Sequence, residues 1–239
     1  MSTAATPDPQ LVRMYERAEQ DYLRSLPLEH FMEATDHATQ REITLESFAL
    51  IRAHRPDVQC FNELLVQYPR GKRKKLGQVV PDNMVVVHPV PIEARGSFNL
   101  SLQPAAPFLV LEYVSKYNKR KDYDDNYEKY HKELRVPYYL LFYPDNQDLT
   151  VFRQAGGKYV SVTPNEYGRL AIPELELEAA LLDSWVRFWF RGELLPLPGE
   201  LLMQLNAEQQ ARVAAERRAA DAETEVARLR EELARAKQP

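Results

Sequence analysis

The stretches Pro81–Val87 (PDNMVVV) and Pro107–Val114 (PFLVLEYV) decide the fold of this chain. Both are near-continuous apolar runs, a pattern typical of central strands that are covered on both faces. Each stretch carries one carboxylate, Asp82 in the first and Glu112 in the second. An ionised carboxylate among aliphatic residues is costly unless it meets a cation, a hydrogen-bond donor or a metal. Two such groups, on strands that could lie side by side, predict a divalent-metal site.

Each carboxylate also has a structural explanation that the residues alone leave open. Asp82 follows a proline, so it could serve as a turn or strand-start residue. Glu112 could form a buried ion pair with a nearby basic residue. The metal-site hypothesis therefore depends on the two groups coming together.

The elements around these strands predict an α+β or α/β core. Thr39, with Glu42 three residues later, has the pattern of a capping box, so we expect a helix from Thr39 that stops before Pro56. We expect the other elements at the following positions: helices over 11–23 and 122–134, a loop over 91–106, and strands over 58–68, 79–90, 107–114, 138–143, 149–153, 158–162, 175–182 and 185–190.

The segment 201–237 differs from the rest because it contains no proline or glycine and is rich in Ala, Glu, Arg and Gln. Val226, Leu229, Leu233 and Ala236 alternate three and four residues apart, which is a heptad-like seam. Such a helix is either solvated and alone or an oligomerisation coil. A long helix without a partner is marginal in water, so we favour a homo-oligomer, a dimer, formed through residues 201–237.

Composition excludes several classes of protein. The 239 residues contain one cysteine, which excludes a disulfide framework and a Cys-rich zinc site, and the five histidines have no metal-binding spacing. No run approaches the roughly 18 apolar residues of a membrane span, and no signal peptide is evident, so we expect a cytoplasmic protein. The net charge is −4, but basic residues crowd two short segments, 70–75 and 116–121, which favours local binding of phosphate.

Two carboxylates suit phosphodiester hydrolysis, which needs a divalent ion, a deprotonated water and a cation near the phosphate. Magnesium typically takes one or two carboxylates together with waters and substrate phosphate. Asp82 and Glu112 supply that set, and the carbonyl of Tyr113 is the expected third protein ligand. We expect Mg²⁺ or Mn²⁺ as the cofactor, with a lysine nearby to orient or activate the attacking water.

The same residues resemble a known family. Pro81-Asp82, Glu112-Tyr113-Val114-Ser115, the helix from Asp122 to Tyr130 and the strand start Val136-Pro137-Tyr138-Tyr139 are similar to the ordered motifs of the Uma-two family, which belongs to the restriction-endonuclease-like PD-(D/E)XK nucleases. The resemblance implies a mixed central sheet flanked by helices and a Mg-dependent endonuclease acting on DNA. We expect an N-terminal helical extension over 1–25, a nuclease-like domain over 26–200 and a helical coil over 201–239.

The sequence departs from this pattern at the lysine. The superfamily places a lysine two residues after the glutamate, where this chain has Val114. The family commonly places one four residues before the tyrosine, where this chain has Asn126. Lys116 shares the pleat parity of Glu112 and is our first candidate. Lys129 shares roughly the helical face of Asn126 and is the second.

Two further possibilities stay open at this point. Glu42, or Glu63 in its place, could lend another carboxylate to the site. The alternative to an enzyme is a catalytically silent scaffold that keeps the nuclease fold and acts through its surface and coil. The missing lysines favour that alternative.

Overall fold

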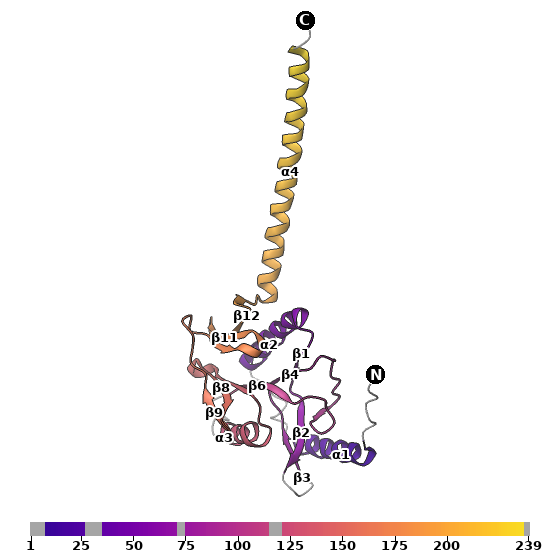
Figure 1. The fold of residues 1–239 in the computed structure, drawn as a ribbon, viewed down its shortest axis with the longest axis vertical. Coiled ribbons are helices and arrows are strands. Elements are labelled where there is room, and N and C mark those ends of the chain that lie inside the picture. The colour runs from indigo at the N-terminus through magenta and orange to yellow at the C-terminus, as the bar shows by residue number, and fades with distance from the viewer. Residues whose placement is uncertain (1–7, 27–34, 71–74, 115–120, 237–239) are drawn as a thin grey trace. The chain divides into compact units, whose positions relative to one another are not determined.

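The structure is a computed structural model that describes residues 8–26, 35–70, 75–114 and 121–236 (Figure 1). The chain folds as two units, residues 1–195 and residues 196–239. The second unit consists of one long helix, α4 (Pro198–Ala236), of 39 residues. Among the helices that the structure describes, none combines the length and the apolar character needed to cross a membrane.

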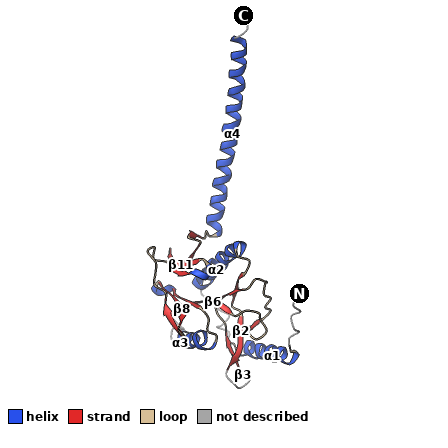
Figure 2. Ribbon diagram, in the orientation of Figure 1, coloured by secondary structure: helices blue, strands red, loops and turns tan. Residues whose placement is uncertain are grey.

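A six-stranded mixed sheet forms the centre of the first unit (Figure 2). Its strands, in spatial order, are β1 (Val58–Asn62), β4 (Asn83–Val87), β6 (Pro107–Tyr113), β7 (Tyr138–Tyr143), β8 (Asp148–Ala155) and β9 (Lys158–Ser161). All neighbours are antiparallel except β6 and β7, which are parallel. A parallel pair needs a crossover connection, and helix α3 (Lys121–Glu128) lies in the segment between these two strands. The expected central strands and their mixed sheet are confirmed.

The two faces of this sheet are both buried, as the apolar runs predict. Alternate residues of β6 point to opposite faces. Leu109 and Leu111 belong to the core that also contains Phe48 and Ile51 of helix α2 (Thr35–His54). Val110 belongs to a second core on the other face. Glu112 has the parity of Val110 and therefore lies on the second face.

Two smaller sheets complete the first unit. One contains β10 (Leu170–Ile172), β11 (Leu177–Leu182), β12 (Trp185–Phe190) and β13 (Glu193–Leu194), with a 3₁₀ turn at Pro173–Leu175. The other contains β3 (Lys75–Val79), β2 (Leu65–Arg70) and β5 (Ser97–Asn99). Helix α1 (Pro9–Ser25) packs on the latter, because Tyr15 is fully buried and its carbonyl accepts a hydrogen bond from Gln67 Nε2 at 3.1 Å.

Several expected elements differ from the structure. The strand expected over 79–90 is β4 alone, because Val79 ends β3 in another sheet. The single strand expected over 58–68 is two strands, because Glu63 has a positive φ of 46° and turns the chain from β1 into β2, which joins another sheet. The loop expected over 91–106 contains β5. The helix expected over 122–134 is α3 followed by a π-helical turn at Lys129–Glu133, with Leu134 N–H donating to the Lys129 carbonyl.

The capping box expected at Thr39 is also wrong. Helix α2 begins at Thr35, and the Thr39 hydroxyl donates to the Thr35 carbonyl at 3.0 Å. A threonine can bond back to the preceding turn from within a helix, so the pattern of Thr39 and Glu42 does not mark a helix start here. The sequence also predicts a short amphipathic segment over 28–34, which lies outside the described residues.

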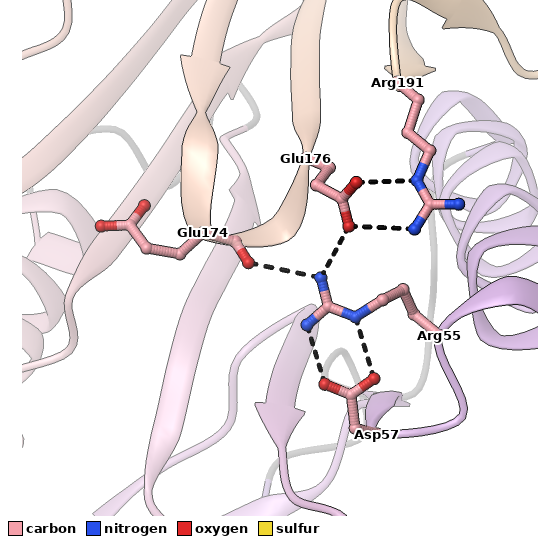
Figure 3. A network of polar contacts seen from close by, with 5 residues as sticks. All are labelled: Arg55, Asp57, Glu174, Glu176 and Arg191. Atoms are coloured by element: carbon pink, nitrogen blue, oxygen red, sulfur yellow. Dashed lines mark hydrogen bonds and ion pairs between the residues drawn. The ribbon is translucent and has the colours of Figure 1, made fainter.

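A polar network joins the end of α2 to the sheet of β10, β11, β12 and β13 (Figure 3). The Arg55 guanidinium holds both Asp57 oxygens, at 2.9 and 2.7 Å, and donates to Glu176 Oε1 at 3.2 Å. Arg191 donates to the Glu176 carboxylate at 2.7 and 3.2 Å. The hydrogen bonds from Arg55, with desolvation opposing them, lower the pKa of Asp57 below its usual 3.8. The network therefore ties β1 to the turn between β10 and β11.

We expect Arg55→Gln to lower the free energy of unfolding by about 1 to 2 kcal/mol at neutral pH, because a bidentate charged pair is lost. Since the Asp57 pKa is lowered in the folded protein, its stabilisation is present above pH 3.8 and is lost as the pH falls further. Urea unfolding over this pH range should show the difference from wild type shrinking. Arg52→Gln, an exposed change on the same helix, is the control. An equal loss in both variants would contradict the role of the network.

Candidate active site

Asp82 and Glu112 meet because of the register between β4 and β6. Asn83 lies opposite Leu111 in this antiparallel pair, so one further residue along each strand brings Asp82 level with Glu112. Met84 and Val86 of β4 belong to the same core as Val110 of β6, so both carboxylates have the parity of this face. Glu112 is 9% exposed. The structure thus brings together the two carboxylates that the sequence singled out.

The Asp82 carboxylate is held by a backbone donor from the neighbouring strand. Its Oδ2 accepts from the Tyr113 N–H at 2.6 Å. Burial raises the pKa of Asp82 to about 6, even though the Tyr113 N–H, the charges of His37 and Arg41 and the contact with Glu112 favour the ionised form. Desolvation of the carboxylate outweighs these donors and cations. The pKa of Asp82 therefore lies well above its usual 3.8.

Glu112 is held from the helix that follows β6. The Tyr130 hydroxyl donates to Glu112 Oε1 at 2.6 Å, and Asn126 Nδ2 donates to the same oxygen at 3.4 Å. Asn126 and Tyr130 are four residues apart and share one helical face. Tyr130 is fully buried, and burial followed by the negative charge of Glu112 raises its pKa well above 10. The phenol consequently stays protonated and remains a donor.

The local helix geometry places Tyr130 in an unusual turn. Tyr130 belongs to the π-helical segment Lys129–Glu133 that continues from α3. Its carbonyl accepts from the Val136 N–H at 2.9 Å, which closes the chain onto the start of β7. Single π-helical turns are frequent at functional sites. Here the turn lies next to the residue that bonds Glu112.

Tyr113 links the site to helix α2. Its hydroxyl donates to Asn83 Oδ1 at 2.7 Å and lies 2.6 Å from Thr44 Oγ1. The Tyr113 side chain points to the face opposite Glu112, while its N–H bonds Asp82. The residue therefore couples β4, β6 and α2 at the level of the carboxylates. The Tyr113 carbonyl stays the predicted third metal ligand.

Helix α2 contributes positive charge that the sequence reasoning missed. His37, Arg41 and Thr44 recur at intervals of four and three residues, so they lie along one stripe of the helix. The His37 ring meets the Tyr113 ring edge-on at 6.4 Å, and the positive charges of His37 and Arg41 favour ionisation of Asp82. The polar stripe was visible in the sequence, but nothing there indicated which strands it would meet.

The two extra carboxylates considered from the sequence do not join this pair. Glu42 is exposed on α2. Glu63 forms an ion pair with Arg41 Nη2 at 2.5 Å and is about half exposed. Within the described ranges, no group of three or more His, Cys, Asp or Glu side chains could hold a metal. A metal at this site would therefore use two carboxylates, with backbone, water or substrate oxygens as its other ligands.

Of the two candidate lysines, Lys129 lies within the described residues and Lys116 does not. Lys116 lies outside the described residues, together with most of both basic segments, 70–75 and 116–121. For Lys129 the structure describes a backbone contact at its carbonyl, and the next residue, Tyr130, is the one that reaches Glu112. Val114 is buried in the core, and its N–H donates to the Phe142 carbonyl at 2.8 Å. Asn126, at the other usual lysine position, bonds Glu112 directly.

Comparisons with known proteins show what this chain is similar to. The family model Uma2, described as "Putative restriction endonuclease", matches residues 27–183, which is more than half of the chain and includes both carboxylates, Asn126 and Tyr130. The crystal structure of a "putative nuclease belonging to DUF820" from Anabaena variabilis ATCC 29413 is similar, with 18% identity and a TM-score of 0.45 over 60% of this chain and 75% of that chain. No curated protein matches. The restriction-endonuclease-like fold expected from the sequence is confirmed.

We expect Asp82→Asn to raise the free energy of unfolding when divalent ions are removed with a chelator, because it removes a buried charge beside Glu112. The asparagine keeps an oxygen that can accept from the Tyr113 N–H. Since the folded-state pKa of Asp82 is raised to about 6 from 3.8, the wild-type charge destabilises fully above pH 6, and the penalty disappears as the pH falls toward 4.

Urea unfolding at several pH values tests this expectation. The stability gain of Asp82→Asn should be largest at pH 7 and above and should shrink toward pH 4. Asp145→Asn, which removes a surface carboxylate, controls for general charge. A gain that does not depend on pH, or a loss at every pH, would contradict the account of a buried charged pair.

Proposed function

We propose that this protein, which belongs to the Uma2 family, is an endonuclease that hydrolyses phosphodiester bonds of DNA with Mg²⁺ or Mn²⁺. The observation that supports this proposal is the pair formed by Asp82 and Glu112, buried at one level of adjacent strands. Membership of the family supports nuclease activity but specifies neither the ion nor the substrate. The ion and the substrate are part of the proposal.

The residues present fit a divalent cation. Two carboxylates in one desolvated position repel each other when both are ionised, and the raised pKa of Asp82 reflects the cost of its charge there. A divalent cation would offset both charges, and carboxylate oxygens are the ligands that Mg²⁺ prefers. Asp82 and Glu112 would hold the ion, and the Tyr113 carbonyl would be its third protein ligand. When bound, the ion would lower the pKa of a water and stabilise charge on the phosphate.

The surrounding side chains would orient the two carboxylates. Tyr130 and Asn126 both donate to Glu112 Oε1. The Tyr113 N–H donates to Asp82 Oδ2. Donors that hold one oxygen of a ligating carboxylate restrict its rotation and improve the site. We propose that Arg41 and His37 supply positive charge on the α2 side of the site.

Two candidate functions, an active nuclease and a silent scaffold, differ in the role of the lysine. In the first, Lys116 or Lys129 assists the attacking water, and the protein is active. In the second, the protein is a catalytically silent nuclease fold that acts as a scaffold. Val114 and Asn126 at the usual lysine positions favour the second candidate, because neither side chain can carry the ammonium charge.

The proposed substrate is the DNA phosphate backbone. The segments 70–75 and 116–121 are rich in lysine and arginine, and phosphate contacts of this kind make binding strongly dependent on salt. Dimerisation through residues 201–237 is part of the same proposal, because two sites can cut two strands. No element of the sequence predicts a module that reads base edges, so we propose no target sequence.

Calorimetry with Mg²⁺ and with Mn²⁺, followed by cleavage of plasmid DNA, tests the proposal. We expect binding of one ion per chain by the wild type and at least a tenfold weaker affinity in Asp82→Asn, because one of two anionic ligands is lost. Asp145→Asn should bind as the wild type does. Absence of binding at millimolar ion would contradict the metal site. Binding without cleavage would favour the silent scaffold.

Asn126→Lys distinguishes the two candidates further. This change places an ammonium group on the helical face that already meets Glu112, where the family commonly has its lysine. If the site is a nuclease that lacks its usual lysine, cleavage should rise by about tenfold or more, within the usual contribution of a positioned acid–base group. Asn126→Gln, which keeps the neutral amide, should give no increase. No cleavage by Asn126→Lys, despite metal binding, would contradict the enzyme reading.

A further inference from the structure

Helix α4 presents an apolar seam that the described structure leaves exposed. Over Ala215–Ala236 the positions that alternate four and three residues apart are Ala215, Ala219, Ala222, Val226, Leu229, Leu233 and Ala236. Every apolar residue larger than alanine in this range falls on that seam. The exposed fractions of Val226, Leu229 and Leu233 are 45%, 50% and 57%. Such a strict stripe is the pattern of a coiled-coil seam rather than of a lone solvated helix.

Outside the seam, charged residues of 215–236 form ion pairs within the helix. Arg228 forms ion pairs with Glu225 and Glu232, and Arg235 lies 3.6 Å from Glu231. Pairs three and four residues apart support a helix by only about 0.2 to 0.5 kcal/mol each. These contacts favour the helix locally but do nothing for the exposed seam. The seam therefore requires a partner with a matching stripe.

We propose that α4 pairs with α4 of a second copy of this chain as a parallel, in-register two-stranded coiled coil over residues 215–236. Val226 occupies the position where a β-branched residue, with leucine at the next core position (here Leu229), favours two parallel strands. The alanines at Ala215, Ala219 and Ala222 let the two backbones approach closely. The seam ends at Arg212 and Glu208, whose charged side chains occupy the preceding core positions.

Charge complementarity selects this partner and this alignment. In a parallel in-register pair, the residue that precedes the core position of Ala219 or of Val226 lies next to the residue five positions further along the partner helix. Arg218 then meets Glu223 of the partner subunit, and Glu225 meets Arg230 of the partner subunit. Both pairs are opposite in charge, and symmetry makes each pair occur twice. A second copy of the chain is thus complementary without any shift along the helix.

Parallel pairing of α4 would bring two copies of the chain together. This pairing does not depend on nuclease activity. In a parallel coil, the two copies of residues 1–195 are tethered at the same end, so each raises the effective concentration of the other. A protein that acts on two strands, or a scaffold that presents two surfaces, would use this arrangement. The coil can therefore be tested without any measurement of metal or DNA.

Disulfide trapping in the full chain tests the orientation. In a Cys60→Ser background, Ala222→Cys and Ala215→Cys each place one thiol in the seam, and Ala220→Cys places one on the outer surface. Mild oxidation should convert both seam variants to covalent dimers and leave Ala220→Cys largely monomeric. An antiparallel pair brings at most one of the two seam positions opposite itself. Trapping at one seam position alone, at neither, or equally at Ala220→Cys would overturn the proposal.

Charge reversal tests the register. Glu225→Arg and Arg230→Glu should each weaken self-association at least severalfold in sedimentation equilibrium, because each creates two like-charge pairs. An equimolar mixture of the two variants should recover association, since all four side chains are then complementary. Glu231→Arg, on the outer surface, should associate as the wild type does. Weak association in the mixture, or an equal loss in Glu231→Arg, would contradict the alignment.

Discussion

Two carboxylates that share one level of a buried sheet are the constraint on which the rest of this site depends. Removing either charged carboxylate, Asp82 or Glu112, from water costs free energy. The two groups also repel each other when both are charged. Hydrogen-bond donors hold both carboxylates. The Tyr113 N–H donates a hydrogen bond to Asp82, and the Tyr130 hydroxyl donates one to Glu112. Two carboxylates that are oriented at one level of the sheet supply the oxygen ligands that a divalent cation prefers.

The neighbouring elements make sense as supports of this pair. Tyr113 faces α2 through its hydroxyl contacts with Asn83 and Thr44, while its backbone faces Asp82. The π-helical turn after α3 brings Tyr130 to Glu112 and closes onto β7. The carboxylates are thus held by the backbone of β6 and by the turn that follows α3. This rigidity suits a ligand site, because restricted carboxylates lose less freedom when an ion binds.

The sequence predicted the carboxylate pair because the cost of a buried charge is visible in the residues themselves. It also predicted β6 and β7 from their continuous apolar runs. It missed His37 and Arg41, since helical periodicity reports which face is buried and not which strand that face meets. It joined β1 and β2 because Glu63, whose positive φ separates them, has no turn signature of its own. The contact of Tyr130 with Glu112 depends on the π-helical turn, which local propensity does not encode.

The central claim is that Asp82 and Glu112 together hold a divalent cation. Anomalous diffraction from crystals soaked in Mn²⁺ above pH 7, where Asp82 is ionised, measures this most directly. The account predicts one anomalous peak within bonding distance of an oxygen from each carboxylate, on the sides away from Tyr113 N–H and Tyr130. A map with no peak between them, in which the two carboxyl groups bond each other through a shared proton, would contradict it.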